Sequence, residues 1–223
     1  MSRLAFDMHA GMRSATEALE DRGWQIVRIK IGDDYLRLRA ADLLSEHGRP
    51  DFVWSSPPCT AFSVAGMGHH WGGGRRAYEP KTEQADEAIR FVAHTLRLMR
   101  DLQPVYGWLM ENPRGLLRKL PVVEGVPRST VTYCQYGDTR MKPTDLWGGI
   151  GGWLPNRSCS PRASCHEAAP RGSRTGTQAL PNALARSAVP YGLSEAVADR
   201  LDAVAGQDVV GPRILSQMTL EVN

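Results

Sequence analysis

The chain has 223 residues, of which 42% are hydrophobic and 23% are charged. This length and composition predict one medium-sized domain with a buried core, and they exclude a disordered tail. A membrane protein is excluded as well, because the sequence has no run of about 18 apolar residues. The formal net charge of +3 permits a polyanionic partner without requiring one.

The cysteines and the N-terminal residues indicate the cellular compartment in which the protein is expected. Four irregularly spaced cysteines do not form the framework of a small disulfide-bonded protein. The first ten residues contain neither a long apolar stretch nor a cleavage site, so no signal peptide is predicted. We therefore expect a reducing, cytoplasmic environment.

The N-terminal part has the pattern of a strand–helix–strand unit. Residues 3–6 predict a short apolar strand, and residues 14–22 share an apolar helix face that Gly23 can end. Residues 24–31 alternate isoleucines with polar residues and predict a second strand. Two strands joined in this way by a helix are typical of a parallel sheet.

The same alternation continues along the chain. Strands are predicted at residues 51–55, 105–110 and 130–134, and helices at residues 82–102 and 194–204. These elements predict an α/β domain with a mostly parallel central sheet and helices on both faces. In such a sheet, reactive residues lie just past the carboxyl ends of the strands.

Composition divides the chain into three parts. We interpret residues 1–147, which carry the strand and helix pattern, as the catalytic domain. Residues 148–183 are rich in Gly, Pro, Ser and Arg without periodicity, and they predict a small, basic, loop-rich segment for target recognition. Residues 184–223 contain the last helix, which would complete the catalytic domain.

Two short motifs, Pro57-Pro58-Cys59 and Glu111-Asn112-Pro113, each follow a predicted apolar strand. A rigid Pro-Pro turn would hold the cysteine at a strand end with few backbone donors near its sulfur. Cysteine is a good nucleophile, and a carboxyl group that reaches the same cleft can protonate or bind a ring nitrogen. A buried structural cysteine beside a strand-ending glutamate is the alternative interpretation.

These motifs resemble those of the DNA cytosine-5 methyltransferases, above all the short phage-encoded members. Residues 52–63 are similar to the family's nucleophile motif, and Glu111-Asn112-Pro113 is similar to its Glu-Asn-Val motif. Residues 135–140 resemble its Gln/Arg motif and residues 186–190 its last motif, in the family's order. The resemblance implies a Rossmann-like class I methyltransferase fold.

The resemblance also implies a mechanism. The target cytosine would be flipped out of the duplex, because its C5 and C6 atoms are otherwise covered by stacking. Cys59 would attack C6, Glu111 would contact N3 and the amine, and Arg140 would hold O2 and the neighbouring phosphate. The expected enzyme is an S-adenosylmethionine-dependent DNA cytosine-5 methyltransferase. We expect it to act on double-stranded DNA as a monomer, in the cytoplasm of a bacterial host.

The donor-binding motif departs from the family's Phe-x-Gly-x-Gly-Gly. Residues 9–14 read His-Ala-Gly-Met-Arg-Ser, so one glycine is retained and an arginine replaces another. Lys30 stands at the position of the ribose-binding acid, for which Asp33 is a possible substitute, and Asp42 matches the acid that contacts the adenine amine. The residues expected at the donor are Asp7, Gly11, Arg13, Lys30, Asp33, Asp42, Pro57 and Ser187.

Two alternatives to the ordinary donor stay open. Positive charge at Arg13, Lys30 and Arg186 would suit a donor with an extra carboxylate, such as carboxy-S-adenosylmethionine, which would transfer a different group to the same carbon. The altered motif is also consistent with a pseudo-methyltransferase that binds DNA without chemistry. Surface charge exposed to solvent is the simplest explanation for Arg13 and Lys30.

Basic residues suggest where DNA would bind. Arg75 and Arg76 follow His70-Trp71 in a glycine-rich loop, and these arginines would contact phosphates while His70 or Trp71 would lie near the flipped base. Arg171 and Arg174 are the best candidates for base or phosphate contacts in the loop-rich segment. A mobile loop without such a role is the alternative for the first group.

Four further residues have side chains that bind metals. Cys134, Cys159, Cys165 and His166 could hold a structural zinc ion and order the loop-rich segment. Their spacing is not that of a standard zinc ribbon or finger. Free cysteines and a surface histidine explain the pattern equally well.

Overall fold

The computed structural model describes residues 2–10, 15–30, 32, 34–73, 78–155, 157–167 and 187–207. Several residues predicted to bind the donor or DNA lie outside these ranges: Gly11, Arg13, Asp33, Arg75, Arg76, Arg171, Arg174 and Arg186. Within the described ranges, no helix has both the length and the apolar character needed to cross a bilayer.

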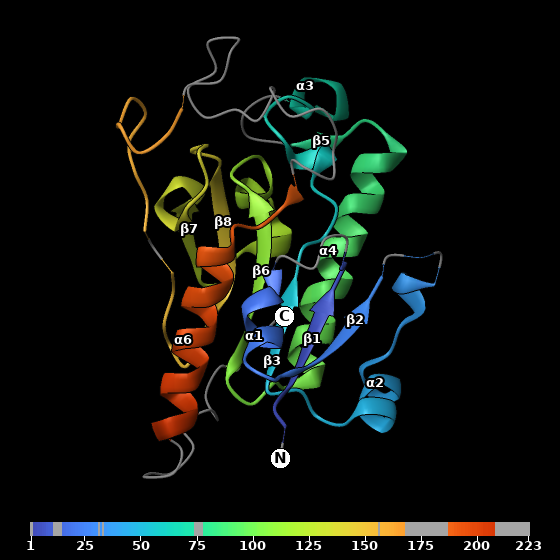
Figure 1. Cartoon of the computed structure of the whole chain (residues 1–223). Coiled ribbons are helices and arrows are strands. Elements are labelled where there is room, and N and C mark those ends of the chain that lie inside the picture. The colour runs from blue at the N-terminus through green and yellow to red at the C-terminus, as the bar shows by residue number, and fades with distance from the viewer. Residues whose placement is uncertain are drawn as a thin grey trace.

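A six-stranded sheet forms the centre of the molecule (Figure 1). Its strands in spatial order are β2 (Gln25–Ile29), β1 (Leu4–Met8), β3 (Phe52–Ser55), β6 (Gly107–Pro113), β8 (Pro143–Ile150) and β7 (Arg128–Thr132). The first four are parallel, and β8 pairs antiparallel with both β6 and β7. The prediction of an α/β domain with a mostly parallel sheet is confirmed.

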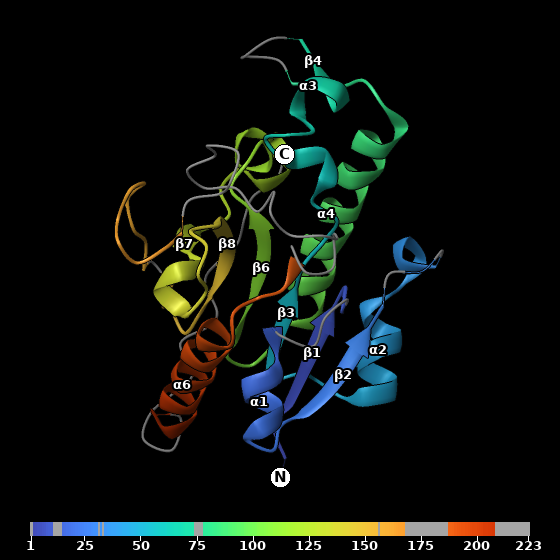
Figure 2. The same cartoon turned by 45° about the horizontal axis from the view of Figure 1, so that its top comes forward.

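Helices cover both faces of this sheet (Figures 1 and 2). On one face, α1 (Glu17–Asp21) packs against α6 (Tyr191–Gln207), and both contact the sheet. On the other face lie α2 (Ala40–His47) and α4 (Glu83–Leu102). The single-turn helices are η2 (Tyr35–Arg37), η3 (Thr60–Phe62), η4 (Leu117–Lys119), η5 (Pro121–Val123) and η6 (Tyr133–Tyr136).

Strand β3 shows why the central strands are apolar on both sides. Phe52 and Trp54 are buried in the core under α1 and α6, whereas Val53 is buried in the core under α2 and α4. Successive side chains of a strand point to opposite faces of the sheet. A strand covered by helices on both faces therefore reads as a continuous apolar run, the pattern from which it was predicted.

The predicted helix at residues 82–102 is confirmed as α4, which begins at Glu83 after Thr82. The Thr82 side chain accepts a hydrogen bond from the backbone N–H of Ala85 at 3.3 Å and so caps the helix. The predicted helix at residues 14–22 is shorter, because α1 covers only Glu17–Asp21 among the described residues. Gly23, with φ of 77°, ends it as expected.

Strand β8 and helix α2 were not predicted, and β8 crosses the proposed domain boundary after residue 147. Gly148 interrupts the apolar pattern of β8. The structure nevertheless requires a glycine there, because a larger residue would not fit. Its φ is 92°, and a Cβ atom would lie 2.4 Å from the backbone oxygen of Trp108. Strand β6 also runs through Pro113, so the Glu111 motif lies within the strand and not after it.

The region after Cys59 corrects another expectation. Residues His70 and Trp71 belong to α3 (Met67–His70) and to β4 (Trp71–Gly72), which pairs with β5 (Glu79–Pro80). The Trp71 indole donates a 2.7 Å hydrogen bond to the backbone oxygen of Ala61, and the ring is 5% exposed. Both side chains are buried, and their predicted place near a flipped base stays a prediction.

Candidate active site

The predicted nucleophile lies in a turn that is fixed to the neighbouring strand. Cys59 follows Pro57 and Pro58 beyond the end of β3 and precedes η3, and its side chain is half-buried. The Asn112 amide donates a 3.1 Å hydrogen bond to the backbone oxygen of Pro57. Asn112 of the Glu-Asn-Pro motif thus helps to hold the Pro-Pro-Cys turn in place, and its side chain is fully buried.

Glu111 is buried beside this turn, with 6% of its surface exposed. The Tyr133 hydroxyl donates a 3.1 Å hydrogen bond to Glu111 Oε1, and the Ser56 hydroxyl is a second partner. Burial raises the pKa of Glu111, while the charge of Lys142 and these hydrogen bonds oppose the rise. The carboxyl group therefore holds its proton at a higher pH than an exposed glutamate does.

Lys142 is a site residue that the sequence reasoning missed. Its ammonium group lies 4.3 Å from the centroid of the Tyr133 ring and 3.4 Å from the backbone oxygen of Ala188. Burial lowers the pKa of Lys142, and the charges of Glu111 and Cys59 oppose this effect. A lysine two residues after Arg140 and directly before Pro143 was the available sequence signal.

Tyr133 and Lys142 connect the two motifs. Each of them interacts electrostatically with both Cys59 and Glu111. The motifs also lie on neighbouring segments, because β3 and β6 are paired and Asn112 binds the Pro57 oxygen. That the thiol and the carboxyl group act on one substrate stays a prediction.

Arg140 is held by a neighbouring acid. Its Nε and one terminal nitrogen donate hydrogen bonds of 2.8 and 2.7 Å to the two carboxylate oxygens of Asp138. This bidentate pair raises the pKa of Arg140 above its already high value. The charge of Arg140 acts on Lys142 and contributes to the lowering of its pKa, which burial dominates. The predicted contact of Arg140 with cytosine stays a prediction.

Asp7 lies in the middle of the sheet, in β1 and in register with Arg28 and Trp54. It is 2% exposed and accepts a 2.9 Å hydrogen bond from the Thr16 hydroxyl. Burial raises the pKa of Asp7 to about 6, although Thr16 and the Arg28 charge act in the opposite direction. The carboxyl group thus binds, from within the core, the residue that directly precedes α1.

His9 is a second residue that was not predicted. It follows β1 with φ of 66°, is 5% exposed, and places its ring 4.3 Å from that of Tyr35. Its Nδ1 lies 2.9 Å from Ser55 Oγ, whereas its Nε2 has no hydrogen-bond partner among the described residues. Burial lowers the pKa of His9 to about 3, so the ring is neutral at physiological pH.

Pro57, in the turn before Cys59, is buried, whereas the three remaining described donor candidates lie at the surface. Lys30 directly follows β2 and is exposed. Asp42 occupies the first turn of α2, where its carboxylate lies 4.0 Å from Arg39 Nε. Ser187 is also exposed. Their roles stay predictions, because no contact of these residues with a donor is described.

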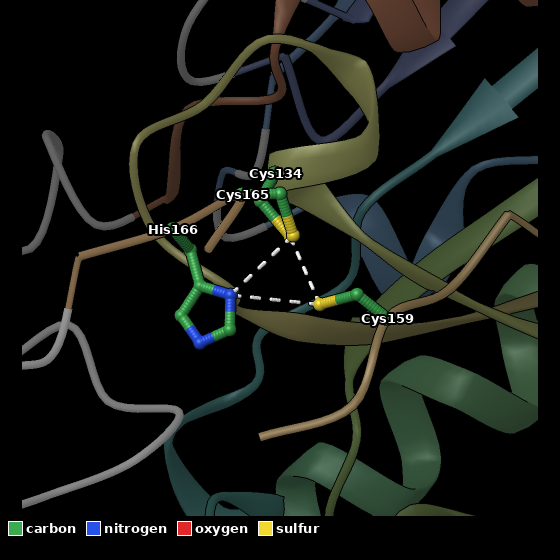
Figure 3. A group of neighbouring side chains, drawn as sticks. All are labelled: Cys134, Cys159, Cys165 and His166. Carbon is green, nitrogen blue, oxygen red and sulfur yellow. Dashed lines mark hydrogen bonds between the residues drawn. The ribbon is translucent and has the colours of Figure 1, made fainter. Parts of the chain in front are cut away.

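The four candidate zinc ligands do come together. The sulfur atoms of Cys134, Cys159 and Cys165 and a ring nitrogen of His166 all lie within 4.8 Å of one another (Figure 3). The cluster connects η6, which begins with Tyr133, to the segment 157–167. Sequence spacing alone did not distinguish this cluster from free cysteines.

Comparison with known proteins supports the resemblance seen in the motifs. No protein-family model matches the chain. A curated protein of Frog virus 3 (isolate Goorha), named "Probable DNA (cytosine-5)-methyltransferase", is 28% identical over 165 residues, which cover 71% of this chain and 76% of the viral protein. The predicted similarity to cytosine-5 methyltransferases is confirmed at this level.

Solved structures of methyltransferases are also similar. A methyltransferase of Entamoeba histolytica matches with a TM-score of 0.48 and 10% identity, covering 72% of this chain and 57% of its own. DNMT2 of Spodoptera frugiperda matches with a TM-score of 0.44 and 11% identity over 71% of this chain and 56% of its own. The chain thus spans little more than half the length of these solved proteins.

Proposed function

We propose that this chain is a DNA cytosine-5 methyltransferase that uses S-adenosylmethionine and forms a covalent adduct between Cys59 and a flipped-out cytosine. One observation supports the proposal most: Asn112, next to the buried Glu111, donates a hydrogen bond to the backbone oxygen of Pro57, two residues before Cys59. The viral relative, which is named a probable DNA (cytosine-5)-methyltransferase, also supports it. A substrate of double-stranded DNA is part of this proposal.

The chemistry follows from the two groups. The Cys59 thiolate forms a bond to C6 of cytosine, and the proton of Glu111 moves to N3 as the C5–C6 double bond opens. The raised pKa of Glu111 favours the protonated form that this step needs. C5 then carries the electron pair that attacks the donor methyl group, and the electrons of the broken carbon–sulfur bond stay on the donor sulfur. A base from solvent takes the C5 proton, the Cys59 thiolate leaves C6, and N3 returns its proton to the Glu111 carboxylate, which restores the ring.

Lys142 would support the thiolate. Its ammonium charge interacts favourably with ionised Cys59, which lowers the free energy of the nucleophilic form. Tyr133 would fix the carboxyl group by its hydrogen bond to Glu111, and Asn112 would fix the turn that carries the thiol. These residues orient the reacting groups without contacting the base in the steps above.

S-adenosylmethionine, when bound, supplies the electrophilic methyl group. The residues present fit such a ligand, since His9 Nε2 is buried and lacks a partner among the described residues at the end of β1. Lys30 is exposed at the end of the adjacent parallel strand β2 and would hold an anionic or hydroxyl group there. Ligands of open α/β sheets bind at this edge.

A duplex that contains 5-fluorocytosine at the target position tests the proposal. Fluorine cannot leave C5 as a proton does, so the wild-type chain with S-adenosylmethionine should accumulate a stable covalent complex. Cys59→Ala should form none while it still binds DNA, and Thr60→Ser in the same turn should form it normally. A wild-type chain that binds DNA and donor without an adduct is a pseudoenzyme and contradicts the proposal.

The mass of the modified nucleoside identifies the donor. Ordinary S-adenosylmethionine gives 5-methylcytosine, whereas a carboxylated donor gives the carboxymethyl product. We expect only the methyl product from a mixture of both donors. A carboxymethyl product would instead favour the exposed Lys30 as a contact for the extra carboxylate.

A further inference from the structure

We propose that Cys134, Cys159, Cys165 and His166 bind one structural zinc ion that holds the segment 157–167 against η6. Three thiolates and one imidazole form a ligand set that proteins use for tetrahedral structural zinc. Four protein ligands leave no open position for water or substrate. The ion would therefore stabilise the fold and take no part in methyl transfer.

The distances between the ligand atoms fit a tetrahedral ion. Zinc–sulfur bonds of about 2.3 Å and zinc–nitrogen bonds of about 2.0 Å require sulfurs about 3.8 Å apart and sulfur–nitrogen distances of about 3.5 Å. The Cys165 and Cys134 sulfurs are 3.8 Å apart. His166 Nδ1 lies 3.6 Å from the sulfurs of both Cys159 and Cys165. The Cys134 and Cys159 sulfurs are closer, at 3.2 Å, and need a small shift.

The fold brings these ligands together from distant parts of the chain. Cys134 lies in η6, immediately after β7. The backbone N–H of Thr132 donates to the Arg157 oxygen at 3.1 Å, and the N–H of Cys159 donates to Thr132 Oγ1 at 2.8 Å. The other end of the segment is fixed where the N–H of Glu167 donates to the Thr139 oxygen at 2.7 Å.

A tight turn returns the chain to the cluster between Cys159 and Cys165. The N–H of Ala163 donates to the Ser160 oxygen at 3.2 Å, and Arg162 adopts a left-handed φ of 77°. The Gln135 amide lies 3.3 Å from the Cys165 sulfur, where it can donate a hydrogen bond to a thiolate. Such outer hydrogen bonds orient the ligands of structural metal sites.

The segment 157–167 contains no helix or strand, so it is held by individual contacts such as the hydrogen bonds of Cys159 and Glu167. Cys134 is adjacent in sequence to Tyr133, whose hydroxyl binds Glu111. A zinc ion at the cluster would thus anchor the same single-turn helix that positions the buried carboxyl group. This role does not depend on the proposed methyl transfer, because the ion's presence is measured directly.

Metal analysis of the purified chain tests the site. After growth with added zinc and dialysis, we expect on the order of one zinc ion per chain. Replacing zinc with cobalt should produce the intense visible bands of tetrahedral thiolate-bound cobalt. Zinc content in Cys159→Ser and His166→Ala should fall at least about tenfold, because a closed four-ligand site loses a ligand.

Matched variants separate the site from general metal binding and from misfolding. Cys59→Ser and His69→Ala, which lie outside the cluster, should keep the wild-type zinc content. His166→Cys should restore binding that His166→Ala loses. The proposal is overturned if the wild-type chain holds less than about a tenth of an equivalent of zinc and gives no tetrahedral cobalt spectrum. A Cys134–Cys159 disulfide in the chain purified without oxidant would overturn it as well.

Discussion

The Cys59 turn and the cysteine–histidine cluster are built in opposite ways. The Cys59 turn lies at the ends of buried strands, where Asn112 and Ser56 connect two neighbouring motifs. The cluster lies on a segment without regular structure, and its ligands are mostly half-buried or exposed. Strand packing and the Asn112 hydrogen bond hold the first region, whereas the proposed zinc ion would hold the second.

This difference predicts how each region responds to change. Substitutions around Cys59 should alter chemistry or core stability while the zinc content stays constant. Substitutions around the cluster should lower the zinc content more strongly than they lower the stability of the core. Each of the following variants tests this difference between the two regions.

Glu111→Gln should have the largest effect, a loss of roughly 10²- to 10⁴-fold in the rate of methyl transfer. The amide keeps an acceptor for the Tyr133 hydroxyl but cannot transfer a proton to N3. Single-turnover kinetics with labelled donor measure the loss, and Glu124→Gln, at an exposed position, is the control. A loss below about threefold would show that proton transfer from Glu111 is not required.

Asp7→Asn should stabilise the chain at neutral pH. The pKa of Asp7 rises from its ordinary 3.8 to about 6 in the folded chain. The folded state therefore binds the proton more tightly, and stability is lost as pH rises from about 4 through about 6, up to roughly 3 kcal/mol. Urea unfolding between pH 4 and 7 should show this slope in the wild type and not in the variant.

Thr16→Val provides the control for Asp7. It removes the hydrogen bond that stabilises the ionised carboxylate, so the pKa of Asp7 should rise further and the loss of stability should extend to higher pH. An equal slope in Asp7→Asn and the wild type would mean that another group titrates in this range. The zinc content should not change in either variant.

Asn112→Ala should lower the free energy of unfolding by about 1–3 kcal/mol. It leaves the buried Pro57 oxygen without its donor, and the Cys59 turn loses its connection to β6. Slower trapping of 5-fluorocytosine should accompany the loss of stability. Asn112→Asp, which has a similar shape without the donor, should be at least as damaging; wild-type stability in Asn112→Asp would contradict this.

Thr132→Val should have the smallest effect, about 1 kcal/mol or less, because the affected N–H of Cys159 is only partly buried. Its consequence should appear instead as weaker zinc binding in competition with a chelator. Ser129→Ala lies on the same strand, and its hydroxyl has no hydrogen-bond partner among the described residues, so it should change neither quantity. Unchanged zinc affinity in Thr132→Val would show that this hydrogen bond does not position Cys159.

Sequence patterns predicted the central strands more accurately than they predicted which side chains outside those strands are buried. The apolar runs of β3 and β6 were visible because both faces of each strand are buried. Strand β8 was not visible, since Gly148 and Gly149 interrupt its pattern. Trp71 was assigned to an exposed loop because its neighbours are polar or glycine, yet its indole is buried against Ala61.

The sequence by itself determined the two motifs, their order and the alternating elements that carry them, because these depend on residues close together in the chain. Only the tertiary structure decided that Lys142 joins Cys59 and Glu111, that His9 Nε2 is left without a partner among the described residues, and that Cys134 meets Cys159. These spatial relations depend on the order of the strands in the sheet, in which β6 lies between β3 and β8. Local periodicity encodes which residues are buried, and it does not encode which distant residues become neighbours.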